Sequence, residues 1–137
     1  MNNDGGINNI KGRNDFRCLI VEDNIHAAEI MAIFFERNGI ASETAENGKK
    51  GLQMYFDRPL EYDIIFIDLQ MPVMDGYEMA RRIRGSGVLN SCAVPLVAMS
   101  GTYTGDTAAK GNFDFFLKKP FEMRCLTGII NEIRRRQ

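Results

Sequence analysis

The sequence predicts an α/β domain built on a doubly wound parallel sheet with helices on both faces. Short apolar runs recur five times along the chain, and parallel strands that are buried on both faces have this composition. Segments with apolar residues at helical spacing lie between these runs, and such alternation is typical of parallel α/β folds. The length of 137 residues suits one domain with one core.

The first half of the chain is expected to contain two strands and two helices. Residues 18–21 form a continuous apolar run that stops at two acids. Residues 24–38 follow with apolar side chains three and four positions apart, and an Asn-Gly pair ends this helix. Residues 41–46 are partly polar, which suits an edge strand. A second Asn-Gly pair opens a helix over residues 48–57, which ends just before a proline.

The second half continues this alternation. Residues 63–68 have the strongest strand character and end in an acid. An aspartate can cap a helix over residues 75–84, which glycines then end. The last two strands are expected at residues 94–99 and 113–117. A final helix from about residue 122 carries apolar side chains on one stripe and arginines at its end, where they suit the helix dipole.

The overall charge argues against a protein that binds polyanions over its whole surface. Lys and Arg total 17, Asp and Glu total 18, and the net charge is −1, so direct binding to nucleic acid is not favoured. The three cysteines, Cys18, Cys92 and Cys125, lie far apart. Their spacing matches neither a disulfide framework nor a zinc site, and a reducing cytoplasm is therefore the expected location.

The sequence shows no membrane span and no secretion signal. No stretch approaches the ~18 apolar residues of a membrane helix, and the first residues lack the pattern of a signal peptide. Residues 1–15 are rich in Asn, Gly and Asp, which predicts a flexible leader. The folded domain is expected at residues 16–137, which leaves little room for a second module.

Polar side chains follow four of the expected strands at the points where the strands end. They are Glu22 and Asp23, then Asp68, Ser100 and Lys119. In doubly wound sheets, ligands bind beyond the carboxyl ends of the strands. We therefore expect these five side chains to converge on one crevice.

The chemistry of this set indicates phosphoryl transfer with a bound metal ion. Carboxylates ~4 Å apart repel each other by about 4 kcal/mol at an effective dielectric near 20, and Mg²⁺ is the expected ion to offset that repulsion. The ion, the ammonium of Lys119 and the hydroxyl of Ser100 could together hold three phosphoryl oxygens. Asp68 is then a plausible nucleophile, because an aspartate can form an acyl phosphate.

Four motifs resemble the receiver domain of two-component response regulators. They are residues 19–24 (LIVEDN), 65–72 (IFIDLQMP), 74–76 (MDG) and 116–120 (FLKKP). The similarity covers about residues 16–134 and is closer to receivers attached to hybrid histidine kinases. It implies a flavodoxin-like fold, a five-stranded parallel sheet in the order 2-1-3-4-5.

The resemblance also implies a role for each residue at the strand ends. Asp68 would accept a phosphoryl group from a phosphohistidine on a partner. Asp23, Asp68 and the backbone carbonyl of Gln70 would bind Mg²⁺ directly, and Glu22 would reach the ion through water. Lys119 would pair with the phosphoryl group.

Further roles follow from the same resemblance. Ser100 would hydrogen-bond a phosphoryl oxygen, and Phe116 would be the aromatic switch that changes rotamer as Ser100 shifts. The peptide bond before Pro120 would be cis. Gln70 and Thr102 fall at positions that tune the rate of self-dephosphorylation in the family.

The implied function is that of a phosphoacceptor signalling domain. It would act as an enzyme only in self-phosphorylation from small donors and in self-dephosphorylation. The implied partners are a sensor or hybrid histidine kinase and a histidine phosphotransfer protein, with no direct contact to nucleic acid or membrane.

Two alternatives are open at this point. The first is a degenerate receiver that binds proteins without being phosphorylated, although the intact set of site residues argues against it. The second is a small phosphohydrolase that forms an aspartyl phosphate. Such an enzyme usually needs a second acid two residues after the nucleophile, where this chain has Gln70.

The chain departs from the family pattern between its fourth and fifth strands. Ser100 and Lys119 are 19 positions apart, which is a few fewer than in the family. The missing residues fall in the segment 101–111, which is rich in Gly and Thr and has poor helix propensity. We therefore expect the family's fourth helix to be short or disordered here, in the face that the family uses for output.

Overall fold

The computed structural model describes residues 16–102 and 112–137. The strands are β1 (Arg17–Val21), β2 (Ala41–Ala45), β3 (Ile64–Asp68), β4 (Leu96–Ser100) and β5 (Phe115–Lys118). The helices are α1 (Ile25–Arg37), α2 (Gly48–Asp57), α3 (Gly76–Arg84) and α4 (Met123–Arg136). The predicted leader, and all but the first two residues of the segment predicted to hold a short or disordered helix, lie outside the described residues.

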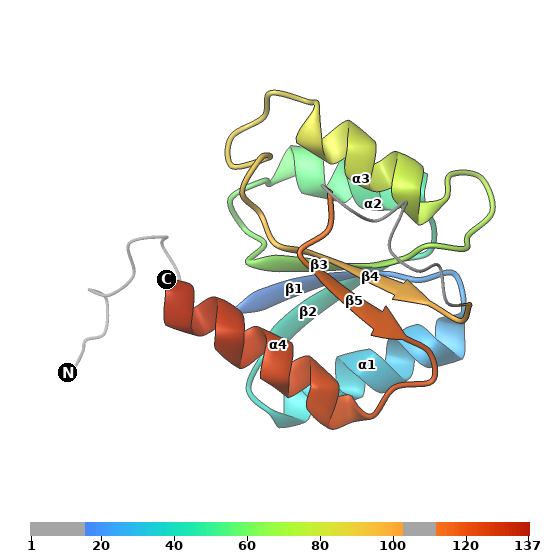
Figure 1. Ribbon diagram of the computed structural model, residues 1–137, viewed down its shortest axis with the longest axis vertical. Coiled ribbons are helices and arrows are strands. Elements are labelled where there is room, and N and C mark those ends of the chain that lie inside the picture. Colours follow the sequence, from blue (N-terminus) through green and yellow to red (C-terminus); the bar gives the residue numbers. More distant parts are fainter. Residues whose placement is uncertain (1–15, 103–111) are drawn as a thin grey trace.

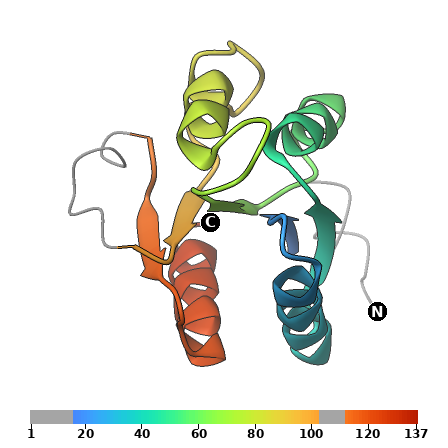
Figure 2. The ribbon, with the colours of Figure 1, turned by 90° about the vertical axis from the view of Figure 1, so that its right-hand side faces the viewer.

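The strands form one parallel sheet in the order β2-β1-β3-β4-β5, as predicted. Helices α2 and α3 cover one face of the sheet, and helices α1 and α4 cover the other (Figure 1, Figure 2). This arrangement brings the carboxyl ends of β1, β3 and β4 side by side at one edge of the sheet.

The sheet separates two apolar cores, because side chains along a strand alternate between its faces. Ile20 and Phe66 are fully buried in the core beneath α1 and α4. Leu19 and Ile65 are fully buried in the core beneath α2 and α3. The central strands are therefore buried on both faces, as their continuous apolar composition predicts.

The last two strands begin two residues later than the sequence predicts, at Leu96 and Phe115. Pro95 has no N–H to donate to a neighbouring strand. The backbone N–H of Asp114 donates to the carbonyl of Leu96 at 2.8 Å, and the Asp114 carboxylate accepts from the N–H of Leu96 at 2.9 Å. Arg84 pairs with the same carboxylate at 3.1 Å. The regular parallel pairing of β5 with β4 therefore begins only after Asp114.

Three helices begin with a side-chain cap at the carboxyl edge of the sheet. Asn24 caps α1, Asn47 caps α2 and Asp75 caps α3, each accepting a backbone N–H at 2.8–3.0 Å. These residues hold the loops that follow β1, β2 and β3 in place. Among the described residues, the structure contains no helix with the length and apolar composition that a membrane crossing requires.

Gly76, the first residue of α3, lies in close contact with the end of β3. The N–H of Gly76 donates to the carbonyl of Leu69 at 3.1 Å. A Cβ atom at Gly76 would lie only 2.6 Å from the carbonyl oxygen of Asp68 and 2.8 Å from the Cα of Leu69. Glycine is therefore required here, and the first turn of α3 packs against the backbone of Asp68.

A group of charged and polar side chains connects β1, β2 and the segment between α2 and β3. We call it the Glu43 cluster: Arg17, Glu43, Arg58 and Tyr62. The carboxylate of Glu43 accepts from the Tyr62 hydroxyl at 2.6 Å, from Arg58 at 2.7 Å and from Arg17 at 3.2 Å. Burial raises the pKa of Glu43, but the hydrogen bond from Tyr62 and the two arginines outweigh burial and hold the pKa below its ordinary value.

Candidate functional site

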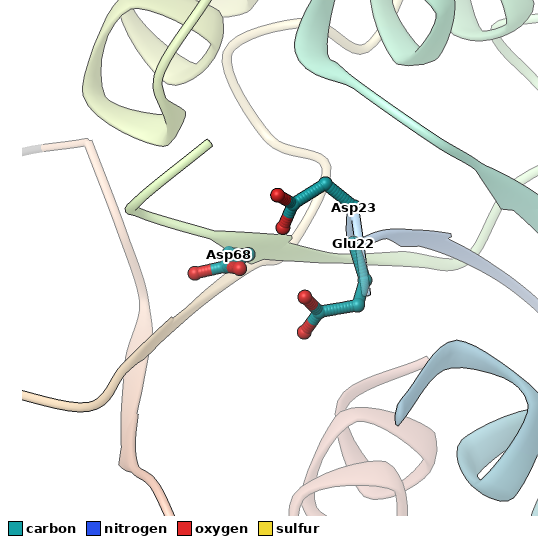
Figure 3. A group of neighbouring side chains, drawn as sticks. All are labelled: Glu22, Asp23 and Asp68. Atoms are coloured by element: carbon teal, nitrogen blue, oxygen red, sulfur yellow. The ribbon is translucent and has the colours of Figure 1, made fainter. Parts of the chain in front are cut away.

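Three carboxylates meet at the carboxyl edge of the sheet, as the sequence predicts. Glu22 and Asp23 follow β1, and Asp68 is the last residue of β3. One oxygen from each lies within 4.8 Å of the others, and Figure 3 shows the three side chains converging on one point. Glu22 and Asp68 are buried, whereas Asp23 is exposed and opens the group to solvent. We call these three residues the acidic cluster.

Lys119 provides a positive charge to this cluster. Its ammonium lies 2.7 Å from Glu22 Oε1 and 3.4 Å from Asp68 Oδ2. The backbone N–H of Lys119 donates to the carbonyl of Ser100 at 2.7 Å, and the following peptide bond to Pro120 is cis, as expected. One ammonium therefore faces three carboxylates, and the group carries excess negative charge when all four are ionised.

The electrostatics of Glu22 show this shortage of positive charge. Burial and the neighbouring Asp68 carboxylate raise the pKa of Glu22 to about 7, despite the ion pair with Lys119. Burial lowers the pKa of Lys119, but Glu22 and Asp68 outweigh it and raise that pKa above its ordinary value. The lysine thus stays charged, and Glu22 takes up a proton more readily than an ordinary glutamate does. A hard divalent cation fits this set of oxygen donors and would supply the missing charge.

Gln70 contacts the acidic cluster through its backbone. Its N–H donates to Asp68 Oδ1 at 3.0 Å, which fixes the direction of that carboxylate. Its exposed side chain donates from Nε2 to Thr102 Oγ1 at 2.9 Å. The sequence predicted a metal role for the carbonyl of Gln70, and that role stays a prediction. It did not reveal that the side chain of Gln70 would reach Thr102, because the two residues belong to different loops.

Ser100 ends β4 and is completely buried. Its hydroxyl donates to the carbonyl of Thr102 at 2.8 Å and accepts from the N–H of Thr102 at 3.1 Å. The hydroxyl is thus engaged with the loop that follows its own strand. Its predicted hydrogen bond to a phosphoryl oxygen stays a prediction.

Phe116 lies in β5, three residues before Lys119. It pairs with Ala98 of β4 and is half-buried. This position is compatible with a ring that moves between two orientations. Its predicted role as an aromatic switch stays a prediction.

A pocket that the sequence did not reveal lies beside the acidic cluster. It has a volume of about 540 Å³, and Glu22 and Lys119 form its polar end. The rest of its wall comes mainly from α1, including Ile30, and from the segment that leads into α4, including Phe121. Ile30 is 55% exposed. Its place within the apolar pattern of α1 was visible in the sequence, but an exposed apolar position cannot be told from a buried one by spacing alone.

Comparisons with known proteins support the resemblance seen in the motifs. The profile described as the response regulator receiver domain matches residues 18–131. A two-component response regulator of Oryza sativa subsp. japonica, ORR41, is 35% identical over 127 residues, which are 89% of this chain and 97% of that protein. The peroxide stress-activated histidine kinase mak1 of Schizosaccharomyces pombe is 32% identical over 126 residues. That alignment covers 88% of this chain but only 8% of mak1, so the chain spans a small part of such kinases.

Solved structures show the same fold. A CheY-like response regulator receiver domain from Methylobacillus flagellatus has a TM-score of 0.78 and 30% identity, over 88% of this chain and 99% of that one. The receiver domain of the sensor histidine kinase PA1611 from Pseudomonas aeruginosa has a TM-score of 0.71 and 24% identity, over 87% of this chain and 97% of that one. That structure holds a magnesium ion in its active-site cleft. The chain belongs to the response regulator receiver domain family, the phosphoacceptor domains of two-component signalling.

Proposed function

We propose that Asp68 accepts a phosphoryl group from a phosphohistidine on a partner protein, with Mg²⁺ bound beside it. The observation that carries this proposal is the acidic cluster itself, three converging carboxylates that face one lysine. A cluster that only stabilised the fold would be expected to pair its buried charges more fully. This cluster is short of positive charge and opens to solvent at Asp23.

The oxygen atoms of the acidic cluster are donors that suit the metal ion. Asp23 and Asp68 would bind Mg²⁺ directly, together with the carbonyl of Gln70, and Glu22 would bind it through water. The bound ion would offset the repulsion among the carboxylates and neutralise charge on a phosphoryl group. The magnesium-containing receiver of PA1611 supports this assignment.

The chemical step transfers the phosphoryl group from nitrogen to oxygen. A carboxylate oxygen of Asp68 attacks phosphorus, an O–P bond forms, and the P–N bond to the partner's imidazole breaks. The imidazole leaves with the electron pair and takes a proton from solvent. Gln70 orients the Asp68 carboxylate through its backbone N–H, and the Lys119 ammonium, now 3.4 Å from Asp68, neutralises charge on the transferred group.

The signal would pass to the surface through Ser100 and Phe116. In this proposal, the hydroxyl of Ser100 turns from Thr102 to a phosphoryl oxygen. Phe116 then changes from an outward to an inward rotamer as Ser100 shifts. The proposed output is a changed protein-binding surface on residues 16–137.

A phosphorylation assay tests the role of Asp68. The chain is incubated with phosphoramidate and Mg²⁺, and its intact mass is measured before and after treatment with hydroxylamine, which cleaves acyl phosphates. We expect the wild type to gain one hydroxylamine-sensitive phosphoryl group and the Asp68→Asn variant to gain none. Asp57→Asn, an exposed aspartate at the end of α2, is the matched control and should behave like the wild type. A wild type that takes up no phosphoryl group would instead support the degenerate receiver.

We propose that the phosphodonor partner, a histidine kinase or histidine phosphotransfer protein, docks at the pocket beside the acidic cluster. The pocket shares Glu22 and Lys119 with the site, so a helix seated there could bring its phosphohistidine to Asp68. Its apolar wall on α1 includes the exposed Ile30, and exposed apolar surface of this kind is typical of protein contacts.

Substitution at Ile30 separates partner docking from chemistry. Ile30→Glu should slow phosphotransfer at least tenfold from a phosphorylated kinase that serves the wild type, yet leave the reaction with phosphoramidate unchanged. Ile33→Glu is the matched control, because Ile33 lies on the same helix and is 49% exposed but does not line the pocket. Equal transfer to Ile30→Glu and Ile33→Glu would contradict the docking proposal.

The state of the cysteines supports a cytoplasmic location for the chain. Cys18 is buried, Cys92 and Cys125 are exposed, and all three are free thiols. Exposed free thiols are compatible with a reducing compartment. We propose this location together with the phosphorelay function.

A further inference from the structure

One hydrogen bond spans the two loops that border the phosphoacceptor. The side chain of Gln70, in the loop after β3, donates to the hydroxyl of Thr102, in the loop after β4, at 2.9 Å. We call this contact the Gln70–Thr102 bridge. Each end of the bridge continues to a residue of the proposed site, because the N–H of Gln70 binds Asp68 at 3.0 Å and Thr102 binds Ser100.

Thr102 uses its backbone to hold the hydroxyl of Ser100. The carbonyl of Thr102 takes the hydroxyl proton at 2.8 Å, and the N–H of Thr102 donates to the same oxygen at 3.1 Å. A hydroxyl has one proton. Ser100 therefore cannot donate to a phosphoryl oxygen while it donates to Thr102, and that bond must break first.

We propose that the Gln70–Thr102 bridge holds Ser100 in its resting position and must open when Asp68 is phosphorylated. This inference rests on the proposed function of Asp68 and Ser100. Gln70 and Thr102 are then positioning residues that act together through Ser100. Gln70 acts only through the shared contact with Thr102, so removing Gln70 should add nothing once the Thr102 hydroxyl is absent.

The bridge should therefore favour the unphosphorylated chain. Without it, Thr102 releases Ser100 more easily, and the phosphorylated conformation becomes easier to reach. One hydrogen bond between exposed side chains has a modest net strength, which corresponds to about a fivefold change in an equilibrium constant. We expect a change of that size, with tighter binding of a phosphoryl mimic.

A double-mutant cycle tests the shared contact. Gln70→Met and Thr102→Val keep the approximate size of each side chain and remove the hydrogen bond between them. Thr102→Val also removes the 3.4 Å contact between the hydroxyls of Thr102 and Ser100. Binding of beryllofluoride, a phosphoryl mimic, is measured by fluorine NMR at saturating Mg²⁺. Each variant should bind at least about fivefold more tightly than the wild type, and the double variant should bind no more tightly than Thr102→Val alone.

Two further variants separate the bridge from general effects of substitution. Thr102→Ser keeps the hydroxyl and should restore binding close to that of the wild type. Gln53→Met replaces an exposed glutamine on α2 and should change nothing. Independent, additive effects of Gln70→Met and Thr102→Val would overturn the proposal, and so would unchanged or weaker binding in either variant.

A second measurement needs neither metal nor phosphoryl group. If the bridge holds the loop, the amide proton of Thr102 should exchange with solvent several-fold faster in Gln70→Met than in the wild type. Suppose that exchange is faster in Gln70→Met but the wild type takes up no phosphoryl group. This result would refute the proposed function and still support the role of the bridge in holding Thr102. If the wild type is phosphorylated but the amide proton exchanges at the same rate in both chains, only the proposed role of the bridge is refuted.

Discussion

The Glu43 cluster is built around a half-buried glutamate and the acidic cluster around a buried one, and the two glutamates differ in how their charge is compensated. Glu43 accepts from two arginines and a tyrosine, and its pKa is lowered. Glu22 shares one lysine with Asp68, and its pKa is raised to about 7. The Glu43 cluster contains enough positive charge to compensate its glutamate, whereas the acidic cluster does not. A buried carboxylate therefore indicates a binding site only when its neighbours leave its charge uncompensated.

The largest expected effect is the response of the acidic cluster to Mg²⁺. Mg²⁺ is expected to bind the folded chain but not the unfolded chain. Its binding should therefore raise the free energy of unfolding by about 2.7 kcal/mol at an ion concentration about 100 times Kd. Urea unfolding with excess Mg²⁺, compared with unfolding in EDTA, measures the change. The double variant Asp23→Asn, Asp68→Asn should show almost none of it. An equal increase in that variant would mean that the ion binds elsewhere.

The next largest effect belongs to the Glu43 cluster. Glu43→Gln keeps the shape of the side chain but removes the charge that Arg17 and Arg58 bind, and should lower the free energy of unfolding by about 2 kcal/mol. Urea unfolding in EDTA measures the loss. A stability equal to that of the wild type would show that the two clusters do not differ in the way described.

Removing a carboxylate charge from the acidic cluster should change the free energy of unfolding in the opposite direction. In EDTA, Asp68→Asn should raise the free energy of unfolding by about 1 kcal/mol, a fraction of the repulsion between two carboxylates at this distance. Asp57→Asn, away from the cluster, serves as the control and should change little. A loss of stability in Asp68→Asn would show that Lys119 already compensates the cluster.

The smallest effect concerns pH. Glu43 has a folded-state pKa below the ordinary 4.5, so its contribution to stability is complete above about 4.5 and is lost as pH falls through the folded-state value. The stability difference between the wild type and Glu43→Gln should shrink on acidification below that value. Urea titrations at several pH values measure this difference. A constant difference would mean that the pKa of Glu43 is not lowered by folding.

The sequence predicted the acidic cluster well because its geometry follows from topology. Glu22, Asp23 and Asp68 end strands that are neighbours in a parallel sheet, and Lys119 follows another. Once the strand order is known, the carboxyl ends must meet. The helices and strands themselves were predictable for a different reason, because apolar runs and helix caps are signals that a short stretch of sequence carries.

Contacts between long side chains of separate loops were not predictable in this way. Arg17, Glu43 and Arg58 are distant in sequence, and nothing in their spacing indicates that they meet. The reach of Gln70 to Thr102 likewise depends on rotamers and loop conformation. The starts of β4 and β5 were misplaced for a related reason, because the side chain of Asp114 competes for the N–H of Leu96.

The close contact at Gly76 has a consequence for building a reporter from this chain. The backbone of Asp68 has no space to move toward α3, since even a methyl group at Gly76 would lie 2.6 Å from its carbonyl oxygen. Gly101, just after Ser100, differs, because a Cβ there would meet no atom within 4 Å. A fluorescent dye could therefore be attached through Gly101→Cys, next to Ser100, in a chain whose exposed Cys92 and Cys125 are first replaced by serine.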